Sequence, residues 1–349
     1  MPRGLVLVLA VAGLLVAALA VQRFATIVAP VVLALILVIA VHPLTGILRR
    51  HGLPAWLAVT VTVLTVLALI LGLFAALVLS IARLAAILPA YEERFAELVI
   101  SLRAVLESLG IEQAEVRAGL DQISVGSIAA LLGDLLTGLA TTFSNLLFLI
   151  FVVVFMGVDA TGFASRLSRS RGQHPDLIGP LDTFVRGTRS YLLVTTVFGL
   201  IVAIFDIAAL WLLGVPLPLL WGLLAFITGY IPNVGYFIGL LPPALLALLE
   251  GGPSLMITVI VTYAAVNFVI QSVIQPKVMS DAVNLSMTLT FLSLVFWTFI
   301  IGPVGAILAI PLTLLAKSVL LDIDPSTRWI SDLLAGGRLH RDDVDPQAG

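Results

Sequence analysis

The stretch GYIPNVG, Gly229–Gly235, interrupts a long apolar run with two glycines, a proline and an asparagine. These residues end a helix. Hydrocarbon offers no hydrogen bonds, so backbone that leaves the helix at membrane depth must be satisfied by protein or by water. The break is therefore expected inside a helical bundle. Many transporters build a solute site from interrupted helices of this kind.

A polar stripe follows the break. Asn267, Gln271 and Gln275 recur at i, i+4 and i+8, and Tyr263 extends the same helix face by one turn. Polar groups at membrane depth face protein or water rather than lipid. The stripe either lines a path for a polar solute or bonds neighbouring helices together, at about 0.6–2 kcal/mol for each contact.

A second interruption resembles the first. Pro232, Asn233 and Gly235 are echoed by Gly302, Pro303 and Gly305, each within an apolar segment. Paired Gly/Pro interruptions predict a transport site. Tight hairpin corners in a bundle would give the same pattern.

Composition decides the broad class of protein. The chain has 349 residues, of which 60% are hydrophobic and 11% charged, whereas soluble domains carry about 25% charged residues. We predict an all-α polytopic membrane protein with about eight transmembrane helices. A net charge of −2 gives no reason to expect nucleic acid as a partner, and the absence of cysteine removes disulfides. The lipid bilayer is the expected environment.

The apolar runs divide the chain into four parts. Residues 1–82 hold the first three membrane spans, and the first span is expected to be uncleaved, because its apolar run of about 17 residues exceeds a usual signal-peptide core. Residues 83–140 form an amphipathic, extracytoplasmic helical insert. Residues 141–321 form a transport core with broken helices, and residues 322–349 a cytoplasmic tail.

The transport core leaves its topology open. Segments 217–249 and 285–321 either cross the membrane or turn back as re-entrant hairpins, and Pro242-Pro243 is expected to interrupt the first of them. The extended third span and the insert favour a homo-oligomer.

Orientation follows from the basic residues. Arg3, Arg49-Arg50 and the Arg-rich loop 159–189 fall on one side, and the acidic insert falls on the other. Because basic loops stay in the cytoplasm, we predict a multi-pass protein of the cell inner membrane with both termini cytoplasmic.

A few charged residues invite functional interpretation. Asp206 is an acid inside an apolar run, where a charge costs about 2.5–3.5 kcal/mol. It is a proton or cation carrier, a structural acid bonded by a neighbouring helix, or an acid near the outer interface. The pairs Lys277/Asp281 and Arg186/Arg189 are either interfacial anchors or parts of a gate, and the two arginines could also capture an anionic solute.

Enzyme signatures are missing from the sequence. It contains no Gly-x-Ser-x-Gly elbow, no phosphate-binding loop ending in Lys-Ser/Thr and no His-Glu-x-x-His. The four histidines are too scattered for a metal cluster. We therefore expect no catalytic residues, no metal and no cofactor.

Five short motifs occur in a specific order in the C-terminal half. They are Gly187-Thr188, Gly214-Val215-Pro216, Ile231–Gly235, Gln275–Met279 and Gly302–Leu312. In this order they resemble the AI-2E family of membrane transporters, which are autoinducer-2 exporter-like permeases. The resemblance covers 183–321 closely and the first half only in layout. It implies a bacterial secondary transporter of about eight spans, with small signalling molecules or Na⁺/H⁺ exchange as cargo in different members. It also implies an acid just before the proline of the polar helix. Gln275 stands there instead, which leaves Asp206 as the remaining buried acid.

Three functions are compatible with these patterns. The first is a permease or exporter that moves a small polar solute or signalling molecule along the breaks and the amide stripe. The second is a Na⁺(Li⁺)/H⁺ antiporter that uses Asp206, with a monovalent cation as cargo. The third is a non-transporting scaffold that binds a partner through residues 83–140.

Overall fold

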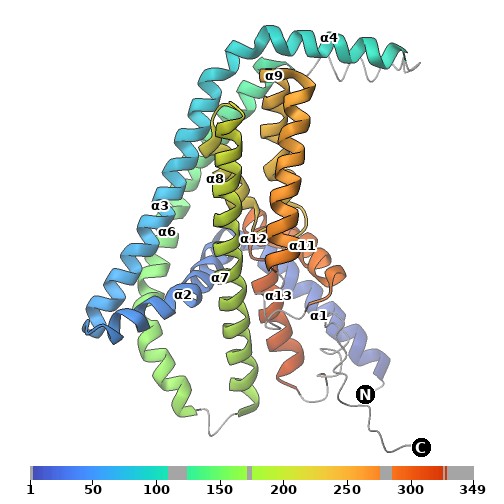
Figure 1. Ribbon diagram of the computed structural model, residues 1–349. Coiled ribbons are helices and arrows are strands. Elements are labelled where there is room, and N and C mark those ends of the chain that lie inside the picture. The colour runs from blue at the N-terminus through green and yellow to red at the C-terminus, as the bar shows by residue number, and fades with distance from the viewer. Residues whose placement is uncertain (1–2, 109–123, 171–174, 276–284, 325–326, 328–349) are drawn as a thin grey trace, which may run out of the picture.

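The computed structural model describes residues 3–108, 124–170, 175–275, 285–324 and 327. Within these residues every regular element is helical, and this confirms the all-α class (Figure 1). In chain order the elements are α1 (Arg3–Arg23), α2 (Ala25–Arg50), α3 (Ala55–Ile87), η1 (Leu88–Tyr91), α4 (Glu92–Ser108), α6 (Val125–Ser170), α7 (Pro175–Leu212), α8 (Pro218–Thr228), α9 (Gly235–Asn267), η2 (Phe268–Ile274), α11 (Met287–Ile301), α12 (Pro303–Ile307), α13 (Ala309–Lys317) and η3 (Ser318–Asp322).

The described helices suit a bilayer. Four continuous helical stretches are long and apolar enough to cross one, and shorter apolar helices accompany them. Large apolar side chains cover the outside, and Trp211 and Leu212 are 74% and 79% exposed. A soluble protein would bury such side chains. The chain is thus a polytopic membrane protein, as its composition predicts.

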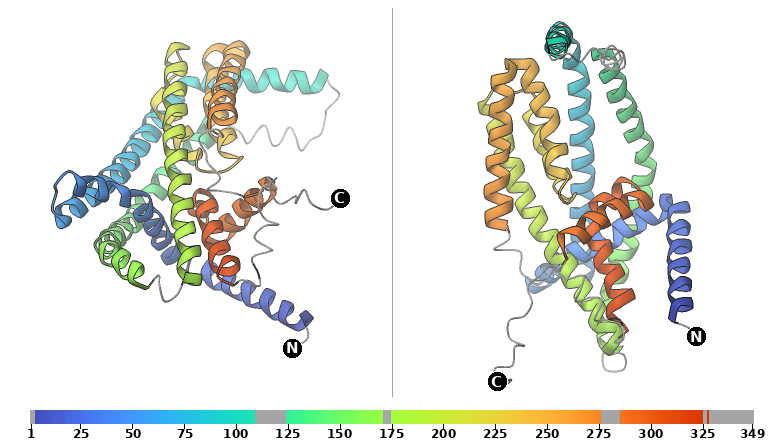
Figure 2. Two further views of the ribbon diagram at one scale, coloured as in Figure 1. Left: turned by 60° about the horizontal axis from the view of Figure 1, so that its bottom comes forward. Right: turned by 90° about the vertical axis from the view of Figure 1, so that its right-hand side faces the viewer.

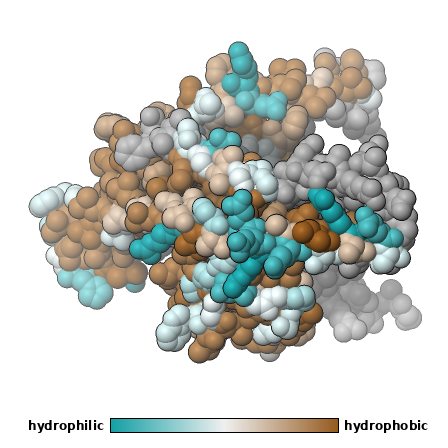
Figure 3. Space-filling model, turned by 90° about the horizontal axis from the view of Figure 1, so that it is seen from above, coloured by the Kyte–Doolittle hydropathy of each residue, from teal (hydrophilic) through white to brown (hydrophobic). Residues whose placement is uncertain are grey.

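The molecule has two distinct ends. Helix α4 crosses one end, and the start of α1 lies near the other, together with the C-terminal end of α6 and the N-terminal end of α7 (Figures 1 and 2). The insert and the Arg-rich loop therefore lie at opposite ends. Seen from the α4 end, hydrophilic residues gather near the middle and hydrophobic residues surround them (Figure 3). The assignment of this end to the outside of the cell stays a prediction.

The insert is continuous with its neighbours rather than a separate unit. Helix α3 runs on to Ile87, and α6 begins at Val125 and continues to Ser170. The expected boundary after residue 140 therefore falls inside one helix.

The first interruption is the tip of a helical hairpin. Helix α8 approaches it and the first arm of α9 leaves it in the opposite direction, so that Gly239 packs on Ala225. Farther from the tip, Leu220 of α8 and Leu246 of α9 belong to one apolar cluster. Segment 217–249 thus turns back on itself.

Helix α9 is itself bent into two arms. The backbone leaves helical geometry at Gly251 and Gly252, and Gly252 has a φ of 74°, which favours glycine. The two arms lie side by side beyond this turn (Figure 2). The expected interruption at Pro242-Pro243 is wrong, because the helix continues through both prolines. Pro243 is buried by neighbouring groups, and packing of this kind lets membrane helices tolerate the lost N–H bonds.

A second hairpin carries the second interruption. Helix α11 ends at Gly302, where φ is 70°, and α12 and α13 return along it. The indole N–H of Trp297 donates to Oγ1 of Thr313 at 3.0 Å across the two arms. Leu294, Ala306 and Ala309 of this hairpin pack against Ile231 and Val234 of the first interruption. The two broken segments are therefore in direct contact.

Glycine allows each hairpin to close. A Cβ atom on Gly235 would overlap the carbonyl group of Thr228, and one on Gly305 would overlap the carbonyl group of Trp297. At both places the added Cβ atom would clash with backbone, so rotation of a side chain could not relieve the overlap.

A polar clamp fixes the turn of α9 to the α4 end of the molecule. The hydroxyl of Tyr91 donates to Oε2 of Glu250 at 2.7 Å. Nη1 of Arg94 donates to the carbonyl oxygens of Leu249 and Glu250 at 3.2 and 3.3 Å, and lies 3.5 Å from Oε2 of Glu250. These bonds satisfy carbonyl groups that a helix end leaves free.

Replacing Gly235 by alanine should destabilise the protein by about 1–3 kcal/mol or more, because the added methyl group forces the hairpin tip apart. Thermal unfolding of the purified protein would measure the loss. Gly72→Ala is the matched control, because Gly72 lies on α3 with open space around its Cβ position. An unchanged melting temperature for Gly235→Ala would contradict this tip geometry.

Candidate functional site

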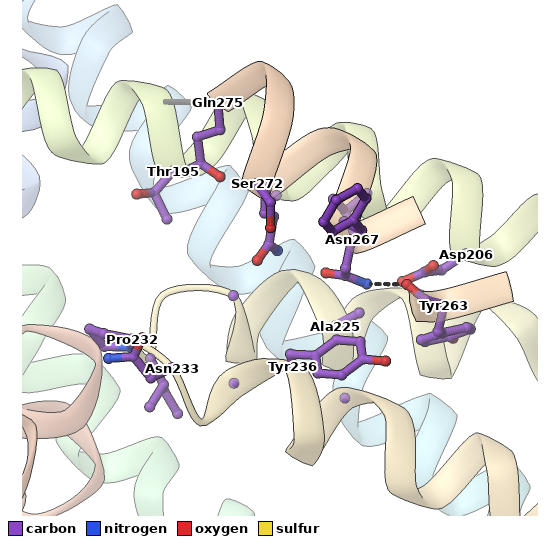
Figure 4. A pocket seen from close by; sticks show the side chains of 18 of the residues that line it. Thr195, Asp206, Ala225, Pro232, Asn233, Tyr236, Tyr263, Asn267, Ser272 and Gln275 are labelled. Carbon is purple, nitrogen blue, oxygen red and sulfur yellow. Dashed lines mark hydrogen bonds between the residues drawn. The ribbon is translucent and has the colours of Figure 1, made fainter. Parts of the chain in front are cut away.

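An open cavity of about 900 Å³ lies beside the tip of the first hairpin. Its walls come from one face of α7, from the break after α8, from both arms of α9 and from η2, and Ile310 adds a contact from the second hairpin. Figure 4 shows polar side chains from these elements around the same space. A cavity of this size suits a small-molecule ligand.

The cavity brings together most of the residues that the sequence singles out. Those lining it are Pro232, Asn233, Gly235, Tyr263, Asn267, Gln271, Gln275 and Asp206. The residues of the second interruption, Gly302, Pro303 and Gly305, are not among its described lining residues, and they shape the hairpin that packs against the break instead. The stripe and the first break therefore share one space, although they are more than thirty residues apart in sequence.

Hydrogen bonds hold the break in shape. Within it, the N–H of Ile231 donates to the carbonyl of Thr228 at 2.8 Å and the N–H of Gly235 to that of Ile231 at 3.1 Å. From α7, the hydroxyl of Tyr191 donates to the carbonyl of Tyr230 at 3.2 Å. The hydroxyl groups of Thr196 and Tyr230 lie 2.7 Å apart. Side chains of α7 thus anchor backbone that no helix satisfies.

Asn233 occupies a special backbone position at the tip. Its φ is 63°, in the left-handed region, which asparagine tolerates better than most residues. Its side chain is exposed and lines the cavity. An amide can both donate and accept hydrogen bonds, so the residue combines a turn conformation with a polar contact for a solute.

The polar helix opposite the tip changes its winding inside the cavity. The chain is α-helical up to Asn267 and π-helical from Phe268 to Ile274. Nδ2 of Asn267 donates to the carbonyl oxygen of Tyr263 at 2.9 Å, which is the bond drawn in Figure 4. Wider π turns often occur at functional sites, and Gln271 and Ser272 of this segment both line the cavity.

Asp206 is fully buried at the edge of this cavity. Its exposed fraction is 0%, and neither carboxyl oxygen has a hydrogen-bond partner among the described residues. Tyr263 is 1% exposed and its hydroxyl likewise lacks a described partner. The expected neighbouring helix that would bond Asp206 is therefore not found among these residues.

The pair Arg186 and Arg189 lies away from the cavity lining. Nε of Arg189 donates to the carbonyl oxygen of Ile39 at 3.4 Å, joining α7 to α2, and Nη2 of Arg186 lies 3.5 Å from Oγ1 of Thr183. Neither arginine is among the described lining residues of the cavity. Lys277 and Asp281 lie outside the described residues.

The sequence analysis missed the polar face of α7. Tyr191, Thr195 and Gly199 line the cavity, one turn apart, and Asp206 continues the same face. Spacings of three and four residues between small or polar side chains would have indicated this face. Ser272 was missed as well, although it lies four residues after Phe268 and three before Gln275, which also line the cavity.

Long apolar helices around a cavity at two touching, interrupted segments are the features of a membrane transporter. Comparison with known protein families shows to which family of transporters the chain belongs. The family model described as AI-2E family transporter matches residues 5–324, and the chain belongs to this family.

Curated relatives are similar over most of their length. The AI-2 transport protein TqsA of Escherichia coli (strain K12) is 29% identical over 88% of this chain and 90% of its own. The putative transport protein YhhT of the same strain is 28% identical over 90% of each chain. The putative transport protein MT0215 of Mycobacterium tuberculosis is 27% identical over 83% of this chain and 81% of its own. The resemblance seen in the motifs is thus confirmed.

Replacing Tyr191 by phenylalanine should loosen the break, because the carbonyl oxygen of Tyr230 loses its donor at a cost of about 1–3 kcal/mol. Hydrogen exchange of the backbone amides in 229–235 would reveal it as faster exchange. Tyr236→Phe is the matched control, because the Tyr236 hydroxyl makes no hydrogen bond to another described residue. Equal exchange in both variants would show that Tyr191 does not hold the break.

Proposed function

We propose that this transporter moves a small polar solute across the bacterial cytoplasmic membrane, and that the solute passes through the cavity beside the first hairpin tip. One observation carries the proposal: the amide stripe and the break line the same open cavity at the contact between two hairpins. In an intact membrane helix the backbone N–H and C=O groups bond to each other. In an interrupted segment some of these groups become available to a polar solute.

The chemistry of the walls suits hydroxyl and amine groups. Amides of Asn233, Asn267 and Gln271 offer donors and acceptors, and Thr195 and Ser272 add hydroxyl groups. No lysine, arginine or histidine occurs among the described lining residues, so an anionic solute would meet no opposite charge. The name of one relative, AI-2 transport protein TqsA, supports a small signalling molecule as the solute.

The transport core is proposed to be residues 141–321. Every described lining residue falls within these limits, from Tyr191 to Ile310. The two hairpins are the candidate moving parts, since each has a tip of tightly packed backbone and a glycine of positive φ, which is Gly252 at the far end of the first hairpin and Gly302 at the tip of the second. Helices α2, α3 and α6, which share one apolar cluster of their own, would provide the frame against which the hairpins move.

The other two functions stay predictions. Na⁺(Li⁺)/H⁺ exchange depends on Asp206, and docking of a partner depends on residues 83–140. The relatives named as transport proteins favour solute transport over a scaffold.

Gln271→Leu and Asn233→Gly should each reduce solute flux at least ten-fold, because each removes one amide from the cavity. Glycine is chosen at 233 because it adopts a positive φ without strain, so that the variant tests the side chain and not the turn. Flux would be measured in proteoliposomes loaded with candidate polar solutes.

Gln22→Leu is the control for these variants. It removes an amide that donates to the carbonyl of Phe299 and that is not among the described lining residues. Flux that falls equally in all three variants, or in none, would reject the cavity as the path.

A further inference from the structure

Two buried polar groups without partners meet at one end of the cavity. Both carboxyl oxygens of Asp206 and the hydroxyl of Tyr263 lack a hydrogen-bond partner among the described residues, and both residues are almost completely buried. Both residues line the cavity, and Figure 4 shows them together at the same end of the site. Buried polar groups are nearly always bonded. Two unbonded polar groups side by side therefore indicate a place where a ligand can donate hydrogen bonds to them.

The surroundings define what this donor can be. Tyr236 and Tyr263, one from each arm of α9, line the cavity together with Asp206. Aromatic faces attract cations, and a carboxylate at membrane depth needs an opposite charge or water. The described lining residues supply no cationic side chain. A positive charge would have to come from a ligand.

We infer that the Asp206–Tyr263 end of the cavity binds the ammonium group of a small organic amine. The inference rests on the proposed function, because it names the chemical class of the solute that the cavity transports. An ammonium group has three donors and no acceptor. It can donate to the carboxyl oxygens of Asp206 and to the hydroxyl oxygen of Tyr263 at once, while the rest of the solute contacts the amides of Gln271 and Asn233.

A bare metal ion fits these groups less well. Hard divalent cations take about six or more oxygen ligands, and the described residues contain no group of three or more His, Cys, Asp or Glu side chains that could hold a metal. A cavity of about 900 Å³ is also far larger than a single ion requires. A solute with a cationic group at one end and polar groups along the rest of the molecule would fill more of the cavity than an ion.

The amine must reach a carboxyl group that has no exposed surface. Tyr263, which lies beside it in Figure 4, belongs to the second arm of α9, between the turn at Gly252 and the π-helical segment η2. Neither end of this arm is a regular α-helix. A small rotation of the arm would expose Asp206, so the subsite is expected to open when the solute arrives.

The test compares three probes of nearly equal size: ethanolamine as the cation, ethylene glycol as the neutral analogue and glycolate as the anion. Isothermal titration of the full-length protein in nanodiscs at pH 7 should show ethanolamine binding at least ten-fold tighter than ethylene glycol, and no binding of glycolate. This comparison needs no variant and so does not depend on any variant folding.

Variants then locate the effect. Asp206→Asn should remove the ten-fold preference for ethanolamine, and Tyr263→Phe should reduce it several-fold. Asp134→Asn should leave it unchanged, because Asp134 lies exposed on α6. A preference that survives Asp206→Asn would overturn the assigned subsite.

The remaining outcomes separate this inference from the proposed function. Equal binding of all three probes, or binding of Li⁺ or Na⁺ in place of ethanolamine, would overturn the inference. If neutral-solute flux still falls in Gln271→Leu, the cavity remains the path and only the amine subsite is rejected. If flux is insensitive to Gln271→Leu as well, both proposals are rejected.

Discussion

The structure depends on one constraint: backbone that stops being helical inside hydrocarbon must find its hydrogen bonds within the protein. The break at residues 229–235 meets this constraint with short bonds of its own and with the hydroxyl of Tyr191. Packing against the second hairpin then covers Ile231 and Val234. The position of the cavity follows, because a break satisfied in this way can only sit where α7 and both hairpins meet.

Close backbone approach makes the arrangement specific. Gly235 and Gly305 each pack against a carbonyl group of the preceding arm. Larger residues would separate the arms, and the separation would remove the contact between the two hairpins. The glycines thus act on the site although only Gly235 touches the cavity.

Much of this could be predicted from the sequence, for identifiable reasons. Composition alone gives the all-α membrane class, and the spacing of Asn267, Gln271 and Gln275 gives their common face. The interruption expected at Pro242-Pro243 was wrong, because tertiary packing overrides the helix-breaking signal of the two prolines. The polar face of α7 was missed because Thr195 and Gly199 are unremarkable residues until the break is placed beside them.

The clamp of Tyr91, Arg94 and Glu250 has a mechanical consequence. It ties the turn of α9 to α4, at the end of the molecule opposite the Arg-rich loop. The cavity wall formed by the second arm of α9 is therefore connected, through about four helical turns of stiff chain, to an element that lies outside the apolar spans. A displacement of α4 would therefore move the second arm of α9 as a rigid element. A molecule that binds to α4 can in this way change the shape of the cavity.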